Sequence, residues 1–166
     1  MVKEIALTQG KIALVDDVDY EYLMQWKWCY AYNGGRGSGY AATGWRDENG
    51  SLTIKYMHQL LAKRLGFNGI VDHMNHDGLD NRRYNLRECT NKQNLANRRK
   101  FQNCSSRYKG VCKLKTGRKK WKAQIVANYI NKNLGCYHNE WIAAIAYNLA
   151  AIYHFGEFAA LNTVEK

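Results

Sequence analysis

One stretch decides how this chain folds: Val71-Asp72-His73-Met74-Asn75-His76-Asp77-Gly78-Leu79-Asp80-Asn81-Arg82-Arg83-Tyr84-Asn85-Leu86-Arg87. A short apolar strand expected over 69–71 ends at Asp72-His73, and a polar loop leads to a second short strand or turn over 84–88. Thr90 is a suitable N-cap for a polar helix over 91–100. The stretch therefore predicts two strands followed by a helix, with acidic, imidazole and amide side chains where the first strand ends.

These side chains suit metal-assisted chemistry. Asp72 and His73 are neighbours on a strand, so they point to opposite sides of it. Asn94 stands on the expected helix, and folding that helix back would give one divalent cation two oxygen ligands, Asp72 and Asn94. Oxygen ligands favour Mg²⁺ or Mn²⁺ over Zn²⁺. An unliganded His73 would take a proton from water near neutral pH, so the pattern predicts phosphodiester hydrolysis.

An arginine beside the motif would steady the phosphate through two parallel hydrogen bonds. Arg82, Arg83 and Arg87 are the candidates, and Arg83 is assigned to this role. The alternative is that these arginines are only solvated. Gly78 and Asn81 are expected to serve backbone turns in the loop.

The quoted stretch, together with Thr90-Asn91-Lys92-Gln93-Asn94, resembles the HNH motif of phage and intron-encoded homing endonucleases over about residues 70–98. The resemblance implies a ββα-metal fold with Asp72 and Asn94 as metal ligands and His73 as general base. It also implies that Asn85 pins the loop between the strands and orients the base. Asp at the first position and Asn at the last are typical of the homing branch. Upstream, Met57-His58-Gln59-Leu60 is similar to a segment of such proteins, and His58 is expected to be structural.

Positive charge is concentrated in one part of the chain, whose net charge is +11. Residues 1–60 hold six Lys/Arg and seven Asp/Glu, whereas Arg98 to Lys132 holds twelve Lys/Arg and no acid. Such a stretch attracts a polyanion by Coulomb force and counterion release. A solvated, self-repelling tail is the alternative, but apolar residues interleave with the charges as in strands. An anionic membrane surface is a third, weaker alternative because the basic residues do not lie on an amphipathic helix.

The basic region and the residues after it predict a β-β-β-α module over about 104–163. The expected elements are strands over 108–114, 120–127 and 133–137, then a helix over Glu140–Phe155 that Asn139 caps and Gly156 ends. Ile142, Ala146, Leu149 and Tyr153 recur at helical spacing. Small residues beside them would let the helix lie close to a sheet.

This module resembles the AP2 DNA-binding domain. The resemblance rests on Ser106-Arg107-Tyr108-Lys109-Gly110-Val111, Trp121-Lys122-Ala123-Gln124-Ile125, Leu134-Gly135, Ala143-Ala144-Ile145-Ala146-Tyr147-Asn148 and Phe158-Ala159-Ala160-Leu161-Asn162. It implies that one face of the sheet packs on the helix and the other enters the major groove of DNA. The alternative is a module that serves only as a structural cap.

Alternation along the strands assigns these faces. Val111, Trp121, Ala123 and Ile125 are expected to face the helix. The residues expected to contact DNA are Lys109, Lys122 and Gln124 on the open face, Lys113, Lys115, Arg118 and Lys120 on phosphates, and Arg98 and Arg99 before the module. Cys112, Leu114 and Val126 stand outward where plant members of the family often have basic residues. Attraction to the DNA backbone is therefore better supported than base readout.

The rest of the chain reads as strands and turns leading into a helix. The expected elements are a strand over 11–15, a helical turn within 19–28, a strand over 26–32, a glycine-rich turn over 33–39, a hairpin of 39–46 and 51–57 around Asp47-Glu48-Asn49-Gly50, and a helix over 58–65 stopped by Gly66. No apolar run approaches the ~20 residues that span a bilayer, and no signal layout precedes the first strand. The five cysteines include no Cys-x-x-Cys pair, so we expect free thiols in a soluble, cytoplasmic protein. The resemblance to homing endonucleases implies that a phage or mobile element encodes it.

Together these features predict an α+β chain with a nuclease domain over 1–103, whose HNH motif spans 70–100, and an AP2-like DNA-binding domain over 104–166. The expected function is metal-dependent hydrolysis of double-stranded DNA by a site-specific, homing-type endonuclease. We expect one Mg²⁺ or Mn²⁺ per active site, no membrane partner, and a monomer or homodimer. The alternatives are a non-catalytic DNA-binding regulator that retains the HNH scaffold, and an RNA-binding protein.

Overall fold

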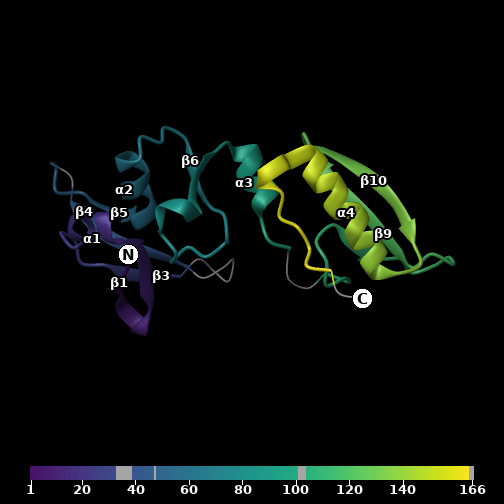
Figure 1. Cartoon of the computed structure of the whole chain (residues 1–166), viewed down its shortest axis with the longest axis horizontal. Helices are drawn as coiled ribbons and strands as arrows, with labels where there is room; N and C mark the ends of the chain where they lie inside the picture. Colours follow the sequence, from purple (N-terminus) through teal and green to yellow (C-terminus); the bar gives the residue numbers. More distant parts are fainter. Residues whose placement is uncertain (33–38, 47, 101–103, 165–166) are drawn as a thin grey trace. The chain divides into compact units, whose positions relative to one another are not determined.

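The computed structural model describes residues 1–32, 39–46, 48–100 and 104–164. It divides into two compact units, Met1–Asn91 and Lys92–Lys166, and mixes helices with strands as expected (Figure 1). Three sequence predictions lie outside the described residues: the glycine-rich turn over 33–38, Asp47 of the hairpin turn, and the end of the first domain at 103.

The first unit begins with an antiparallel pair, β1 (Val2–Ala6) and β2 (Ile12–Asp16), followed by α1 (Asp17–Leu23). The sequence predicted β2 and a helical turn but missed β1. Ile5 is the one buried residue in β1, so charged and apolar residues do not alternate there in the way that identifies a strand. This strand forms because it pairs with β2, and no local sequence pattern predicts it.

A second sheet places β4 (Tyr40–Arg46) between β3 (Cys29–Ala31) and β5 (Leu52–Tyr56). The predicted hairpin is confirmed, with Ala42 opposite Tyr56, and Gly50 takes a φ of 76° beside its turn. Helix α2 (Met57–Arg64) follows directly, and the side chain of Gln59 caps it by accepting from the Tyr56 amide.

One hydrophobic core unites this unit. Its buried members are Ile5, Leu7, Ala13, Val15, Leu23, Trp28, Ala41, Met57, Leu60, Leu61 and Leu86. They come from β1, β2, α1, β4, α2, the adjoining loops and the start of β7 (Leu86–Cys89), so the core anchors the segment that carries the predicted motif.

The motif forms β6 (Ile70–His73) and β7 (Leu86–Cys89), which pair antiparallel, and then α3 (Asn91–Asn97). The second strand starts later than predicted because Arg83–Asn85 makes a 3-10 turn, η2. The helix is shorter than the predicted 91–100, since the Arg98 amide already donates to Leu95 across a tighter turn. The predicted order of strand, loop, strand and helix is confirmed.

The second unit continues as β8 (Val111–Lys113), β9 (Trp121–Ala127), β10 (Ile130–Tyr137), α4 (Glu140–Phe155) and the 3-10 turn η3 (Gly156–Phe158). The sheet is antiparallel with β9 in the middle, and α4 lies along it (Figure 1). The bounds of α4 match the prediction. The first strand is shorter than predicted because Gly110 takes a φ of 75° against the ring of Tyr147.

The predicted faces of β9 are also observed. Ala123 and Ile125 are buried on the side of the sheet that faces α4. Ala143, Ala144 and Tyr147 of α4 are buried with them. Val126 points the other way and is 59% exposed. Within the described residues, no helix has the length and apolar character needed to cross a membrane.

Candidate active site

Asp72 and His73 end β6, and both are buried, each with 7% of its surface exposed. In the register of β6 and β7, Asp72 lies opposite Arg87 and His73 lies opposite Leu86. The Arg87 guanidinium donates to Oδ2 of Asp72 from Nε at 3.1 Å and from Nη2 at 2.8 Å. These two hydrogen bonds hold the carboxylate at a fixed place on the hairpin.

His73 is set among other rings. Its imidazole lies 5.1 Å from that of His58 and 6.0 Å from the ring of Tyr40, measured between centroids. Burial lowers its pKa, while a hydrogen bond to Asn81 and the nearby carboxylate of Asp72 act in the opposite direction. The imidazole is therefore neutral near pH 7, which is the protonation state that a general base requires.

The amide that contacts this imidazole belongs to Asn81. Nε2 of His73 lies 3.3 Å from Oδ1 of Asn81, which can only accept. With this amide orientation Nε2 carries the proton and the lone pair is on Nδ1. The sequence had assigned Asn81 to a backbone turn and the orientation of the base to Asn85, and no local pattern distinguishes the two amides.

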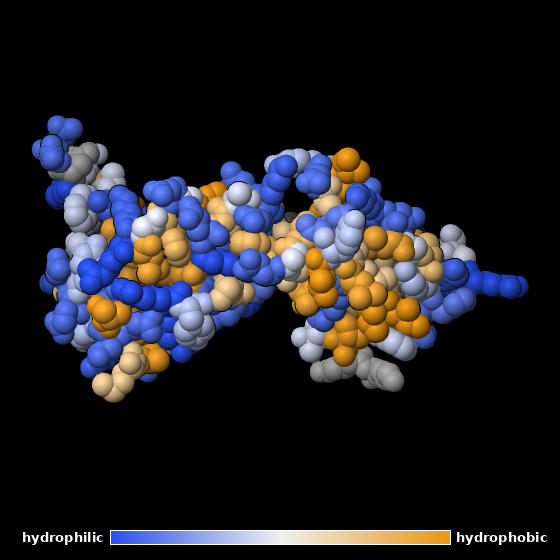
Figure 2. All heavy atoms as spheres, turned by 45° about the horizontal axis from the view of Figure 1, so that its top comes forward, coloured by the Kyte–Doolittle hydropathy of each residue, from blue (hydrophilic) through white to orange (hydrophobic). Residues whose placement is uncertain are grey.

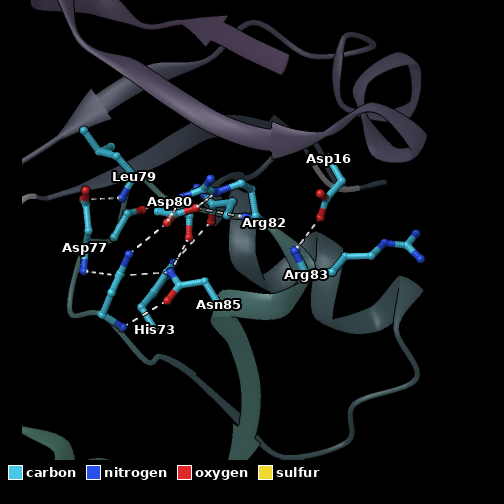
Figure 3. A network of polar contacts seen from close by, with 11 residues as sticks. Asp16, His73, Asp77, Leu79, Asp80, Arg82, Arg83 and Asn85 are labelled. Carbon is cyan, nitrogen blue, oxygen red and sulfur yellow. Dashed lines mark hydrogen bonds and ion pairs between the residues drawn. The ribbon is translucent and has the colours of Figure 1, made fainter. Parts of the chain in front are cut away.

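The side chain of Asn85 is hydrogen-bonded within the loop that follows β6. Its Oδ1 accepts from the Asn75 amide, and its Nδ2 donates to Oδ1 of Asn75 and to the carbonyl of Asp80 (Figure 3). Asn85 is 1% exposed, so these bonds satisfy an amide that would otherwise be costly to bury. The loop is thereby closed on the start of β7.

The same loop is fixed to the sheets of the first unit. Leu14 on β2 donates to Leu79 and accepts from Asn81 through backbone bonds of 2.8 Å. A Cβ on Gly78 would come within 2.2 Å of the Gly39 carbonyl, so close approach to the chain before β4 requires glycine there. The predicted turn role of Gly78 therefore has a packing cause.

The other two candidate phosphate-binding arginines are also held by carboxylates. Arg82 makes a bidentate pair with Asp80, with both bonds at 2.7 Å. Arg83 makes a bidentate pair with Asp19 on α1, also at 2.7 Å. Its backbone amide donates to the Asp16 carboxylate (Figure 3).

The pair on Asp19 is built into the fold. Arg64 of α2 donates to the same carboxylate, and Asp19 is 1% exposed. Hydrogen bonds from Arg83 lower the pKa of Asp19 despite its burial. Arg83 therefore ties η2 to α1, a role that the sequence did not reveal because Asp19 lies far away in the chain.

Asn94 lies on α3, half-buried, in the second unit. Asp72 lies in the first unit, and its carboxylate oxygens, like the amide oxygen of Asn94, are of the kind that a hard divalent cation takes as ligands. In the part of the chain that the structure describes, no three His, Cys, Asp or Glu side chains gather as a metal site.

The predicted DNA-binding residues of the second unit are mostly exposed. Lys113, Lys115, Arg118 and Lys120 cluster on β8 and the turn that joins it to β9. Lys122 and Gln124 are half-buried on the face of β9 that points away from α4. Arg98 and Arg99, after α3, are exposed. Lys109 differs, because its ammonium donates to two backbone carbonyls within the unit.

The outer face of α4 is apolar, with Leu149 and Ile152 largely exposed. Figure 2 shows hydrophobic surface on the second unit. A polyanion would find no charge complementarity on such a face, so the basic residues of β8, β9 and their turn are the better candidate for a nucleic-acid surface.

Comparisons with known proteins agree with the motif. Residues 65–96 match the sequence model of a family described as HNH endonuclease. An uncharacterised HNH endonuclease of Acanthamoeba polyphaga mimivirus is 40% identical over 95 residues, which is 57% of this chain and 48% of the relative. The chain thus spans about half the length of that relative. No solved structure matches.

The matched segment contains Asp72, His73, Asn85 and Asn94, so the predicted HNH motif is confirmed at the level of the family. The AP2 resemblance and the homing type stay predictions, as do the individual roles of the site residues.

Proposed function

We propose that this chain is a metal-dependent endonuclease that hydrolyses phosphodiester bonds in double-stranded DNA, of the site-specific homing type. The observation that carries the proposal is the end of β6, where a buried carboxylate and a neutral imidazole adjoin inside the segment that matches HNH endonucleases. A structural role alone would not require both groups at a strand end, since burying polar groups is costly.

In this proposal His73 accepts the proton of the attacking water. Asn81 accepts from Nε2, which fixes the tautomer and makes Nδ1 the basic nitrogen of the ring. Asn85 keeps the loop closed and so holds the imidazole in position. Asp72 and Asn94 would hold Mg²⁺ or Mn²⁺, which when bound supplies electrostatic stabilisation to the phosphate.

In this proposal none of the arginines paired with carboxylates binds the DNA phosphate. Arg83 was assigned to that role from the sequence, but its guanidinium is engaged with Asp19. Its function in the proposal is to support η2, and hence the position of Asn85.

The second unit, in this proposal, holds the DNA. Its sheet presents Lys122 and Gln124 away from α4, and Lys113, Lys115, Arg118 and Lys120 stand nearby along the chain. An AP2-like contact would use the sheet in the major groove and the lysines on phosphates. The resemblance further suggests a phage or mobile element as the source of the gene.

The experiment is incubation of supercoiled plasmid with the purified chain and Mg²⁺ or Mn²⁺, with and without EDTA. Metal-dependent nicking or linearisation is expected, and sequencing of the ends would reveal whether the cuts share a site. Retarded plasmid that is never cut, with either metal, would favour the alternative of a DNA-binding regulator. Binding that is competed by RNA but not by duplex DNA would favour the RNA-binding alternative.

A further inference from the structure

In the basic region, the ammonium of Lys109 makes hydrogen bonds to the backbone of its own unit. Its ammonium donates to the carbonyl of Ala96 and to the carbonyl of Arg98, both at 2.6 Å. These carbonyls lie in the last turn of α3 and just beyond it, where an α-helix leaves carbonyl groups without intrahelical partners. A lysine near such an end also interacts favourably with the helix dipole.

The backbone of Lys109 is fixed as firmly as its ammonium. Its amide donates to Oδ1 of Asn162 at 2.7 Å, and Nδ2 of Asn162 donates back to its carbonyl at 3.1 Å. Asn162 exchanges a second pair of bonds, of 2.8 and 2.9 Å, with Asn148 on α4. A continuous set of hydrogen bonds therefore runs from α4 through Asn162 and Lys109 to the end of α3.

Two further observations indicate that this arrangement is built into the unit. The residue after Lys109 is Gly110, where a Cβ would come within 2.0 Å of the Tyr147 ring, so the backbone lies directly on α4. Burial lowers the pKa of Lys109 to about 8, as expected for an ammonium that has left bulk water. A lysine that reaches for DNA phosphates would be solvated in the free protein.

We propose that Lys109 is a positioning residue that fixes the C-terminal end of α3 to the rest of the second unit, rather than a contact to DNA. Asn94 lies on the same helix, two residues before Ala96. This inference rests on the proposed function, in which Asn94 is the second metal ligand: by fixing α3, Lys109 determines where Asn94 lies. This role replaces the DNA contact that was predicted for Lys109 from the alternation of residues along the first strand of the module.

The test compares Lys109→Met and Lys109→Arg with Lys63→Met, which removes one exposed lysine of α2 and serves as the matched control. Hydrogen exchange of the α3 amides is measured in EDTA, so that neither metal nor cleavage contributes. In Lys109→Met we expect exchange in α3 to quicken about tenfold relative to the control. Lys109→Arg is expected to act in the same direction, because a planar guanidinium does not replace a compact ammonium between two carbonyls.

Two binding measurements complete the test. Mn²⁺ affinity is expected to fall about tenfold in Lys109→Met, as for other residues that orient a ligand. The slope of log affinity for duplex DNA against log salt is expected to stay unchanged.

The opposite pattern would overturn the inference: unchanged α3 exchange, together with a slope shallower by about 0.9 in Lys109→Met and fully restored in Lys109→Arg. If Lys109→Met does not fold, the α3 exchange of Lys109→Arg decides: quickened exchange supports the inference, and unchanged exchange overturns it. The exchange and salt measurements stand even if the chain cuts no DNA, so failure of the inference is distinguishable from failure of the proposed function.

Discussion

The two units use positive charge differently. In the first unit the arginines near the site are bonded to carboxylates: Arg82 to Asp80, Arg83 to Asp19 and Arg87 to Asp72. In the second unit, among the described side chains, Lys115, Arg118 and Lys120 make no ion pair and are exposed. Charge in the first unit thus builds the fold around the site, whereas charge in the second is available to a polyanion.

The largest loss of stability is expected when the buried carboxylate of Asp19 is removed. Asp19→Asn leaves the guanidinium groups of Arg64 and Arg83 without their shared partner. Breaking a buried pair costs about 3–5 kcal/mol, and because the two arginines are 41% and 39% exposed we expect about 2–3 kcal/mol. Urea denaturation at pH 7 measures the loss.

Asp17→Asn is the matched control in the same helix, because Asp17 pairs with Lys3 at 3.6 Å on the surface. Its cost should stay below about 1 kcal/mol. Equal losses in the two variants would remove the distinction between structural and available charge. The lowered pKa of Asp19 adds a sign: its stabilisation is complete above the unfolded pKa of about 4 and disappears as pH falls through the folded value, and Asp19→Asn should lack this acid dependence.

A second effect is expected on DNA binding when lysines of the second unit lose their charge. Lys113→Gln, Lys115→Gln and Lys120→Gln together should make the salt slope shallower by about 2.7 and weaken binding roughly 100-fold at low salt. Fluorescence anisotropy with a labelled duplex measures both. The control replaces Lys11, Lys27 and Lys63 of the first unit in the same way, and a slope that changes equally in both triple variants would contradict the account.

A smaller effect concerns His58, which stacks on Tyr56 and whose Nδ1 is buried without a hydrogen-bond partner. Burial, with a contribution from His73, lowers its pKa to about 3. The unfolded chain binds this proton below about pH 6.5 and the folded chain does not, so stability falls as pH drops below that value. The slope is at most about 1.4 kcal/mol per pH unit.

His58→Phe keeps the stacked ring and removes the titrating group. Its stability should therefore decline less than that of the wild type between pH 7 and pH 5. Asp19 and Asp80, whose pKa values are lowered, remain charged in that window in both proteins. An identical decline would show that His58 is not the group that resists protonation.

Much of the fold follows from local pattern. The strand ending at Asp72-His73, the hairpin β4–β5 and the helix α4 each have a clear period and a clear stop signal, and the structure places them as predicted. The identity of the buried face of β9 follows from alternation alone.

The parts that sequence could not predict depend on partners far along the chain. Strand β1 needs β2, Arg83 needs Asp19, and Lys109 needs the end of α3. A sequence does not distinguish an arginine or lysine whose charge is solvated from one whose charge is paired with a distant residue. Asn81 was missed for a related reason, since its contact with His73 depends on how the loop closes.

The most direct test of the nuclease assignment is His73→Ala, measured by single-turnover cleavage of duplex DNA beside a gel-shift titration of the same preparation. A general base contributes about 10²–10⁴-fold, so the account predicts cleavage slower by at least about 100-fold with DNA affinity within about twofold of the wild type. Cleavage by His73→Ala at a rate near that of the wild type would contradict it.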